Sequence, residues 1–195
     1  MRIISGYARG RKLFTPGHSN QIRPTSDRAR EALFSIIGSR VVSARVLDLY
    51  AGTGALGLEA LSRGASQAVF VDYHRKALEL IQRNCTLCLQ GMAIQEKKRA
   101  IIIKHDLSRG LSLKSEQFSN PEPFDLIFLD PPYEKGLAIK SLTELDSSAF
   151  ITSTTLVIAE ESSGETFPDS LTRLTLLQKR RYGDTGFWFY TVAPS

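Results

Sequence analysis

The chain has 195 residues, enough for one domain with a small appendage and too few for two large ones. Hydrophobic residues make up 42% and charged residues 23%, proportions that are typical of globular proteins and exclude wholesale disorder. No apolar run approaches the roughly 18 residues that span a bilayer, and the start of the chain lacks the apolar region of a signal peptide. Two cysteines are too few for a disulfide framework, so we expect a cytoplasmic protein.

The net charge of +5 is concentrated near the N-terminus. Residues 1–30 carry seven Lys and Arg against one acid, a balance of +6, and the rest of the chain balances at −1. This asymmetry predicts an arm that binds a polyanion, although a solvated face kept for solubility gives the same pattern. The candidate RNA-binding residues are Arg9, Arg11, Lys12, Arg23 and Arg28.

The first 40 residues are expected to form a small extension of hairpin and helix. Two short strands are predicted at 2–5 and 11–15, because a glycine-bearing turn separates them. After the polar residues 25–27, apolar residues at helical spacing predict a helix that ends at Gly38 and carries Arg28 on its polar side.

From residue 45 onward, short apolar runs alternate with amphipathic segments. Strands are predicted at 46–50, 68–72, 100–103, 124–129 and 156–159, and helices at 55–63, 75–89 and 137–145. The runs 172–179 and 186–192 flank a turn at 182–185, which predicts a final antiparallel hairpin. The pattern predicts an α/β fold, doubly wound around a mostly parallel sheet.

A G-x-G-x-x-G run, formed by Gly52, Gly54 and Gly57, directly follows the first of these strands and opens a helix. The first two glycines let the backbone turn sharply and approach a ligand, and the third lets the helix pack closely on the strand. Thr53 lies inside this turn. The next strand ends in Asp72, where a carboxylate can accept hydrogen bonds from both ribose hydroxyls. Together these features predict a nucleotide-type site.

Asp48, four residues before Gly52, indicates which ligand this site takes. A carboxylate here would repel the pyrophosphate of a dinucleotide, whereas S-adenosylmethionine has no phosphate and carries two positive charges. The alternative for Asp48 is an N-cap or a loop hydrogen bond. Asp106 follows the strand 100–103 and is placed either to accept from the adenine amino group or to cap a short helix.

The second motif, Asp130-Pro131-Pro132-Tyr133, follows the strand 124–129 at the edge where doubly wound sheets bind ligands. Each proline holds the preceding residue extended, and neither has an N–H group. The corner therefore offers hydrogen-bond acceptors, the Asp130 carboxylate and backbone carbonyls, with almost no donors. An exocyclic amine satisfies such a pocket, whereas a keto oxygen would suffer a desolvation penalty of about 1–3 kcal/mol.

These groups fit methyl transfer to an amine. Hydrogen bonds from both amine hydrogens to Asp130 and the Pro131 carbonyl would raise electron density on nitrogen and align it for direct SN2 displacement. Tyr133 offers a flat face on which an unstacked base can lie. The alternative for this motif is a plain turn at the end of a strand.

Cys85 and Cys88 have C-x-x-C spacing but lie late in a predicted helix, and no second pair or histidine cluster completes a zinc site. We expect buried thiols and no metal.

The two motifs together resemble the Rossmann-fold, S-adenosylmethionine-dependent amino-methyltransferases. More narrowly, the whole chain is similar to the bacterial 16S rRNA (guanine-N2)-methyltransferase family, on the segments 5–11, 23–25, 30–34, 46–64, 128–133 and 182–185. That family often has Glu where Asp72 stands. The resemblance implies a seven-stranded sheet with a reversed last strand, an extension over residues 1–40 that holds RNA, and a methyltransferase domain over 41–195.

The resemblance also implies that the substrate is 16S rRNA in an assembling small subunit. Nothing in the sequence demands a dimer or a membrane partner, so we expect a monomer with no membrane partner. A DNA adenine-N6 methyltransferase is the nearest alternative, because it shares the Asp-Pro-Pro-Tyr motif, but the chain leaves no room for a region that reads the groove. A non-catalytic RNA-binding assembly factor is another, which intact Asp130 and Tyr133 disfavour. A nicotinamide oxidoreductase is the third alternative, which Asp48 disfavours because its carboxylate would repel the pyrophosphate of the dinucleotide.

Overall fold

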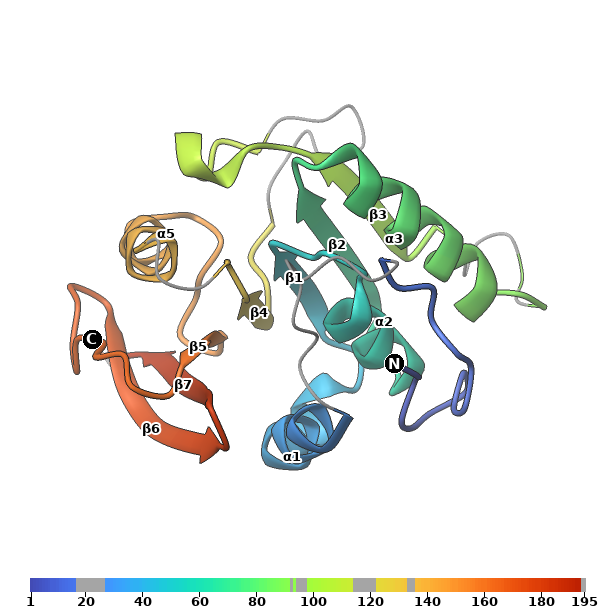
Figure 1. The fold of residues 1–195 in the computed structure, drawn as a ribbon. Coiled ribbons are helices and arrows are strands. Elements are labelled where there is room, and N and C mark those ends of the chain that lie inside the picture. Colours follow the sequence, from blue (N-terminus) through green and yellow to red (C-terminus); the bar gives the residue numbers. More distant parts are fainter. Residues whose placement is uncertain (17–26, 92, 94–97, 114–121, 133–135, 194–195) are drawn as a thin grey trace.

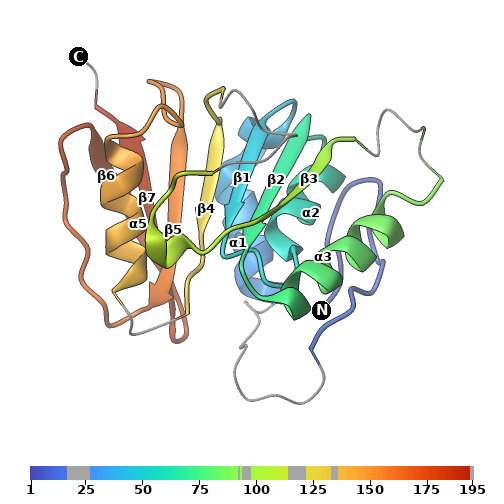
Figure 2. The same ribbon diagram turned by 90° about the horizontal axis from the view of Figure 1, so that it is seen from above.

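The computed structural model describes residues 1–16, 27–91, 93, 98–113, 122–132 and 136–193 (Figure 1). A seven-stranded sheet has the strand order β3-β2-β1-β4-β5-β7-β6, and Figure 2 shows the strands side by side. The strands are β1 (Arg45–Leu49), β2 (Gln67–Asp72), β3 (Ala100–Lys104), β4 (Leu126–Leu129), β5 (Leu156–Ser162), β6 (Leu174–Tyr182) and β7 (Thr185–Val192). β1 to β5 are parallel, and β7 runs antiparallel between β5 and β6. The predicted doubly wound sheet with a reversed last strand is confirmed.

Helices cover both faces of the sheet, as predicted. They are α1 (Asp27–Ile37), α2 (Ala55–Ser62), α3 (Arg75–Cys88) and α5 (Leu137–Asp146), with short 3-10 turns η1 (Gly38–Val41) and η2 (Leu107–Arg109). One core contains apolar side chains of α1, α2 and α3, packed on strand residues such as Phe70 and Phe128. The other contains those of α5, packed on residues such as Leu49 and Val157. Among the described residues, no helix combines the length and apolarity needed to cross a membrane.

The final hairpin is also confirmed. Tyr182 of β6 pairs with Thr185 of β7, so two residues form the turn. The first of them, Gly183, has φ of 63°, which favours glycine.

The N-terminal hairpin differs from the prediction. A single antiparallel bridge joins Arg2 and Lys12, and neither predicted strand forms. The backbone N–H groups of Ile4 and Ser5 donate to the Glu59 carboxylate of α2 at 2.7 and 3.0 Å. The two segments do pair antiparallel over a short stretch, since Ile3 N–H donates to Arg11 and Leu13 N–H to Met1, at 3.0 and 3.2 Å, but beyond Ile3 the N–H groups turn to α2.

This N-terminal segment packs into the core of the protein. Ile3, Ala8 and Leu13 are buried in the same cluster as α1, α2 and α3. Gly6 has φ of 80°, and a Cβ there would lie 1.6 Å from the carbonyl oxygen of Ser62. Residues 1–16 therefore pack directly on α2 and α3 (Figure 1).

Candidate active site

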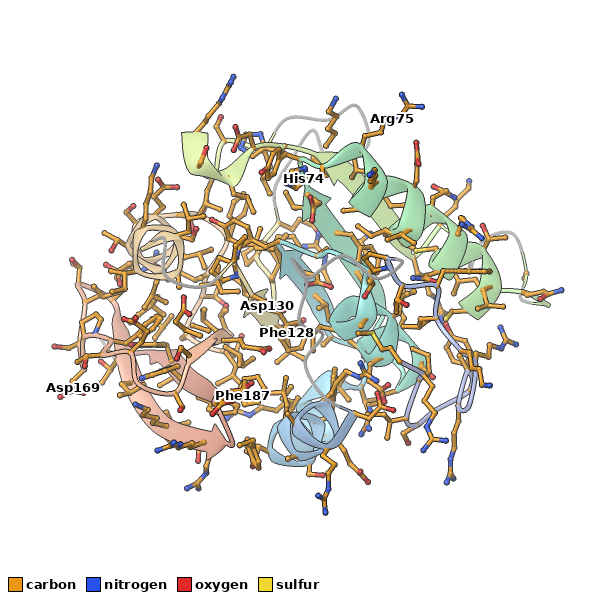
Figure 3. The ribbon with its side chains drawn as sticks, viewed as in Figure 1. His74, Arg75, Phe128, Asp130, Asp169 and Phe187 are labelled. Carbon is orange, nitrogen blue, oxygen red and sulfur yellow. The ribbon has the colours of Figure 1, made fainter. Side chains whose placement is uncertain are left out.

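Both motifs lie at the carboxyl edge of the parallel sheet, on neighbouring strands. Leu49 of β1 is in register with Leu129 of β4 on one side and with Val71 of β2 on the other, so Tyr50, Asp130 and Asp72 begin the loops at one level. The strand order reverses between β1 and β4, which is where ligands bind in doubly wound sheets. The geometry that the sequence predicted for the two motifs is therefore present, and Figure 3 shows Asp130 near the middle of the molecule.

The glycine turn has the backbone shape that the motif requires. Gly52 and Gly54 have φ of 55° and 75°, and the space above Gly52 is open, since a Cβ there would find its nearest neighbour, the Tyr50 carbonyl oxygen, 3.8 Å away. At Gly57 a Cβ would lie 2.4 Å from the Phe70 ring, so this glycine lets α2 pack closely on β2. Thr53 is buried, and its hydroxyl is directed to the sulfur of Met1 at 3.5 Å.

Asp72 joins the glycine turn to the end of β2. Its carboxylate accepts from the backbone N–H groups of Gly52 and His74, each at 2.9 Å, and the residue is 8% exposed. Each carboxylate oxygen can accept a further hydrogen bond. The Asp72 carboxylate can thus still receive a ligand hydroxyl while it fixes the turn.

Asp48 makes the loop hydrogen bond that the sequence left as an alternative. Its Oδ2 accepts from the backbone N–H of Gly57 at 2.9 Å, and the side chain is only 2% exposed. Burial raises the pKa of Asp48 to about 7, the Gly57 hydrogen bond opposes this shift, and the negative charge of Asp72 adds to it. The carboxyl group lies beneath the site, with a charge that a cationic ligand would stabilise.

Asp130 is half-buried directly after β4, and its backbone N–H donates to the carbonyl of Leu49 at 3.4 Å. Burial raises the pKa of Asp130 well above its ordinary value, and the negative charges of Glu160, Asp48 and Glu161 raise it further. Pro131 is buried and Pro132 is exposed. Asp130, Glu160 and Glu161 thus form a crowded cluster of carboxyl groups, which we call the acidic corner.

Two parts of the acidic corner escaped the sequence analysis. Glu160 and Glu161 lie just before the end of β5 at Ser162 and are 3% and 4% exposed. Their signal was available, because β5 continues past the apolar run into two acids at the same edge. Tyr50 has φ of 62°, and its hydroxyl lies 2.7 Å from that of Ser141 on α5. No sequence pattern predicted this left-handed backbone conformation at Tyr50.

Asp106 takes the capping role of its two predicted alternatives. Its Oδ1 accepts from the backbone N–H of Ser108 at 3.1 Å and from the Ser108 hydroxyl at 2.6 Å, and Arg109 lies 3.2 Å from its Oδ2. These hydrogen bonds lower the pKa of Asp106. Tyr133 and Arg23 lie outside the described residues.

The basic residues of the N-terminal arm divide into two groups. Arg9, Lys12 and Arg28 are exposed. Arg11 instead donates to the carbonyls of Leu87 and Cys88 at the end of α3, at 2.5 and 2.7 Å. Its guanidinium neutralises a helix C-terminus, which ties the arm to α3.

The two cysteines are buried, as expected. Burial raises the pKa of Cys85 to about 12 and that of Cys88 to about 11, so neither is a reactive thiolate. Within the part of the chain that the structure describes, no group of three His, Cys, Asp or Glu side chains could hold a metal.

Comparisons with known proteins all point to one family. The model of the family described as Conserved hypothetical protein 95 matches residues 1–191. The chain is 33% identical to YlbH of Bacillus subtilis (strain 168), over 97% of this chain and 98% of YlbH. It is 30% identical to ribosomal RNA small subunit methyltransferase D of Escherichia coli (strain K12), over 97% of this chain and 89% of that protein.

A solved structure, yhhF from Escherichia coli, superposes with a TM-score of 0.79 at 28% identity and covers 100% of this chain and 99% of that one. The chain belongs to the family of Conserved hypothetical protein 95, the family of ribosomal RNA small subunit methyltransferase D.

Proposed function

We propose that this protein transfers a methyl group from S-adenosylmethionine to the exocyclic N2 amino group of a guanine in 16S rRNA. The observation that carries the proposal is the acidic Asp130 corner beside the glycine turn, on adjacent strands of one sheet edge. The names of the relatives support an rRNA methyltransferase, and the choice of guanine N2 rests on the chemistry of the corner and on the family resemblance.

The donor set of the site fits S-adenosylmethionine. Gly52 leaves open space for close approach of a ligand, and Asp72 has acceptor capacity for the ribose hydroxyls. Asp48, Asp72 and Asp130 place negative charge at this edge, and their mutual repulsion contributes to the raised pKa values of Asp48 and Asp130. A ligand with an ammonium and a sulfonium relieves that repulsion, whereas a pyrophosphate would increase it.

The acidic corner favours guanine over the other amino bases. Guanine presents two adjacent donors, N1–H and N2–H₂, on its Watson–Crick edge, whereas adenine and cytosine each place a ring-nitrogen acceptor beside their amino group. A carboxylate at Asp130, with Glu160 and Glu161 close enough to raise its pKa, would repel that acceptor. Two parallel N–H bonds to one carboxylate also fix the base in the plane of the carboxylate.

When bound, S-adenosylmethionine supplies an electrophilic methyl group on a positively charged sulfur. Asp130 and the Pro131 carbonyl accept the hydrogen bonds that orient the amine and raise the electron density on its nitrogen. As the new carbon–nitrogen bond forms, that nitrogen must lose a proton. The Asp130 carboxylate is placed to receive it, because its raised pKa makes it a stronger base than an ordinary aspartate.

The RNA is held by the exposed cations of the N-terminal extension, residues 1–40, in front of a methyltransferase domain over 41–195. Arg9, Lys12 and Arg28 are exposed and carry this role, with Arg23 and Tyr133 as further contacts on sequence grounds. A monomer that works in the cytoplasm on assembling small subunits completes the proposal.

Incubation with methyl-labelled S-adenosylmethionine and unmodified small ribosomal subunits tests it. Digestion of the RNA and mass spectrometry should yield one labelled nucleoside, N2-methylguanosine. Label in N6-methyladenosine, or no label in RNA, would contradict the proposal. Free 16S rRNA run in parallel shows whether assembly of the particle is required.

A further inference from the structure

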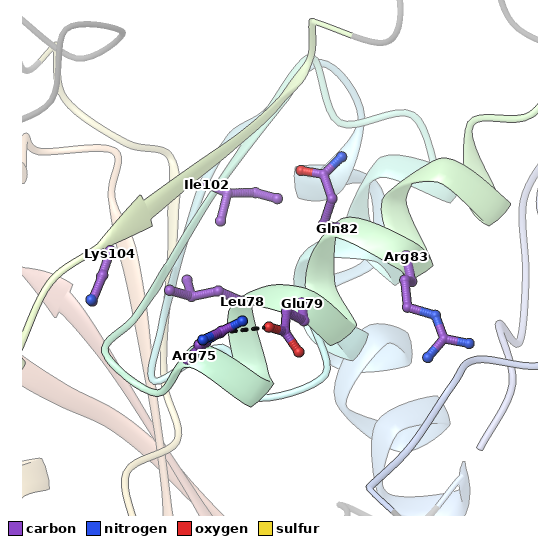
Figure 4. A pocket seen from close by; sticks show the side chains of 7 residues that line it. All are labelled: Arg75, Leu78, Glu79, Gln82, Arg83, Ile102 and Lys104. Atoms are coloured by element: carbon purple, nitrogen blue, oxygen red, sulfur yellow. Dashed lines mark hydrogen bonds and ion pairs between the residues drawn. The ribbon is translucent and has the colours of Figure 1, made fainter.

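A groove that the reaction does not use lies between α3 and β3, at the edge of the sheet. It is a shallow, open groove of about 720 Å³, lined by Arg75, Leu78, Glu79, Gln82, Arg83, Ile102 and Lys104 (Figure 4). Its floor is apolar, from Leu78 and Ile102, and its rim carries three cations against one acid. That acid, Glu79, is paired with Arg75 at 2.8 Å, so the rim has a net positive charge.

An aromatic platform stands beside the groove on the side of the N-terminal segment. Phe14 is 41% exposed, and the Arg83 guanidinium lies over its ring at 4.0 Å from the centroid. The backbone of Phe14 is fixed by buried Asn84, which accepts from its N–H at 2.8 Å and donates to its carbonyl at 3.0 Å. An exposed ring held this firmly at both its backbone and its face loses little further conformational entropy when a ligand binds.

The same Asn84 amide links the platform to the active site. Its nitrogen also donates to the carbonyl of Thr53 in the glycine turn, at 2.9 Å. At the other end of the groove, Lys104 is in register with Asp72. Exposed Tyr73 follows Asp72 and has its ring centroid 3.8 Å from that of His74, which gives this end an aromatic surface as well.

From these contacts we infer that the α3–β3 groove binds a single-stranded segment of the substrate RNA, with phosphates on Arg83 and Lys104 and a base stacked on Phe14. The inference rests on the proposed function and adds a second RNA surface to the N-terminal cations. Proteins that hold single-stranded nucleic acid combine a cationic groove with exposed aromatic rings, and this surface has both. From Arg75 to Arg83, α3 rises about 12 Å, so the groove follows more than one nucleotide.

Two variants test the groove, and both keep the backbone hydrogen bonds between Phe14 and Asn84. Phe14→Ala removes the ring and keeps the backbone bonds to Asn84, and the double variant Arg83→Gln, Lys104→Gln removes two charges. The matched control is Arg180→Gln, Arg181→Gln, which removes two exposed charges from β6 at the opposite edge of the sheet. The probe is a fluorescein-labelled single-stranded RNA of roughly 12 nucleotides, within the usual site size.

Phe14→Ala should weaken RNA binding roughly 5- to 150-fold, the range for loss of one stacked base. The Arg83–Lys104 variant should lower the slope of log affinity against log salt by about 1.4, because each lost phosphate contact contributes about 0.7 for a single strand. The β6 control should bind like the unaltered protein at matched salt, and S-adenosylmethionine affinity by calorimetry should stay unchanged throughout.

If the groove variants bind RNA as the unaltered protein does while that protein still methylates rRNA, the inference is wrong and the proposed function stands. An equal loss in the β6 control would also overturn the inference, since it would show only an effect of net charge. If the unaltered protein neither binds the probe nor methylates rRNA, the proposed function and the inference fall together.

Discussion

Replacement of buried Asp48 by asparagine should stabilise the protein relative to the unaltered chain, and this gain in the free energy of unfolding should be larger at alkaline than at acid pH. The residue is 2% exposed, and its pKa is raised from an ordinary 3.8 to about 7. Because the folded protein holds this proton more tightly than the unfolded chain, stability falls as the pH rises between these two values. The amide oxygen of Asp48→Asn can still accept from Gly57, so the variant removes the charge and keeps the hydrogen bond.

The size of the effect follows from the pKa. One pKa unit corresponds to about 1.4 kcal/mol, so ionised Asp48 costs the fold about 4 kcal/mol once the pH is well above 7. Between about pH 5 and pH 8.5 the unaltered protein should lose roughly 2–3 kcal/mol relative to Asp48→Asn. Bound S-adenosylmethionine should reduce this loss, because a cationic ligand favours the ionised carboxylate.

Urea unfolding at several pH values measures this difference directly, as the change in free energy of unfolding between the two proteins. The matched control is Asp169→Asn, which removes an exposed carboxylate far from Asp130 and the carboxyl ends of the parallel strands (Figure 3). Asp169→Asn should follow the unaltered protein at every pH. If the difference in free energy of unfolding between Asp48→Asn and the unaltered protein does not change with pH, Asp48 is not a buried carboxylate with a raised pKa.

Three further predictions concern the same edge of the sheet and the N-terminal segment. Asp130→Ala should lower the single-turnover rate of methyl transfer by about 10²-fold or more with nearly unchanged cofactor affinity, and a rate like that of the unaltered protein would contradict the role of Asp130. In the unaltered protein, the rate should fall on the acid side at a pH above the ordinary pKa of an aspartate. Asp72→Ala should weaken S-adenosylmethionine binding by about 1–3 kcal/mol in calorimetry, and an unaltered dissociation constant would remove Asp72 from the site. Gly10→Ala should cost about 1–2 kcal/mol from its positive φ alone, whereas Gly6→Ala should cost clearly more in thermal unfolding because it also meets the Ser62 carbonyl; equal losses would contradict the close contact.

Much of the fold could be predicted because local pattern and global architecture agree in it. The alternation of apolar runs and amphipathic segments placed the strands and helices within a few residues, and the glycine turn and the proline corner fell where parallel strands end. Gly57 is a clear case, since the close packing expected of it is present against Phe70.

The structure differs from the sequence predictions where a polar group that looked available in the sequence forms a hydrogen bond with a residue distant in the chain. Arg11 was counted as an RNA contact from its charge, but the end of α3 lies close by and its carbonyls bind the guanidinium. The N-terminal hairpin is shorter than predicted, because the antiparallel pairing reaches only to Ile3 and the next N–H groups, of Ile4 and Ser5, donate to Glu59 of α2.

Arg30 shows the limit of charge counting most clearly. It contributes to the basic N-terminal balance, yet it is fully buried and donates to Asp27 and to the carbonyl of Arg2. Its apolar helix neighbours place it on the inner face of α1, where Asp27 lies three residues away and the Arg2 carbonyl arrives from the N-terminal segment. No linear pattern contains that contact.

A crystal structure of the protein with S-adenosylhomocysteine and guanosine tests the central claim most directly. We expect the thioether sulfur above Gly52 and the guanine N2 amino group within hydrogen-bond distance of the Asp130 carboxylate, at one edge of the sheet. A ligand seated elsewhere, for example in the α3–β3 groove, or a guanine that turns its O6 to Asp130, would contradict it.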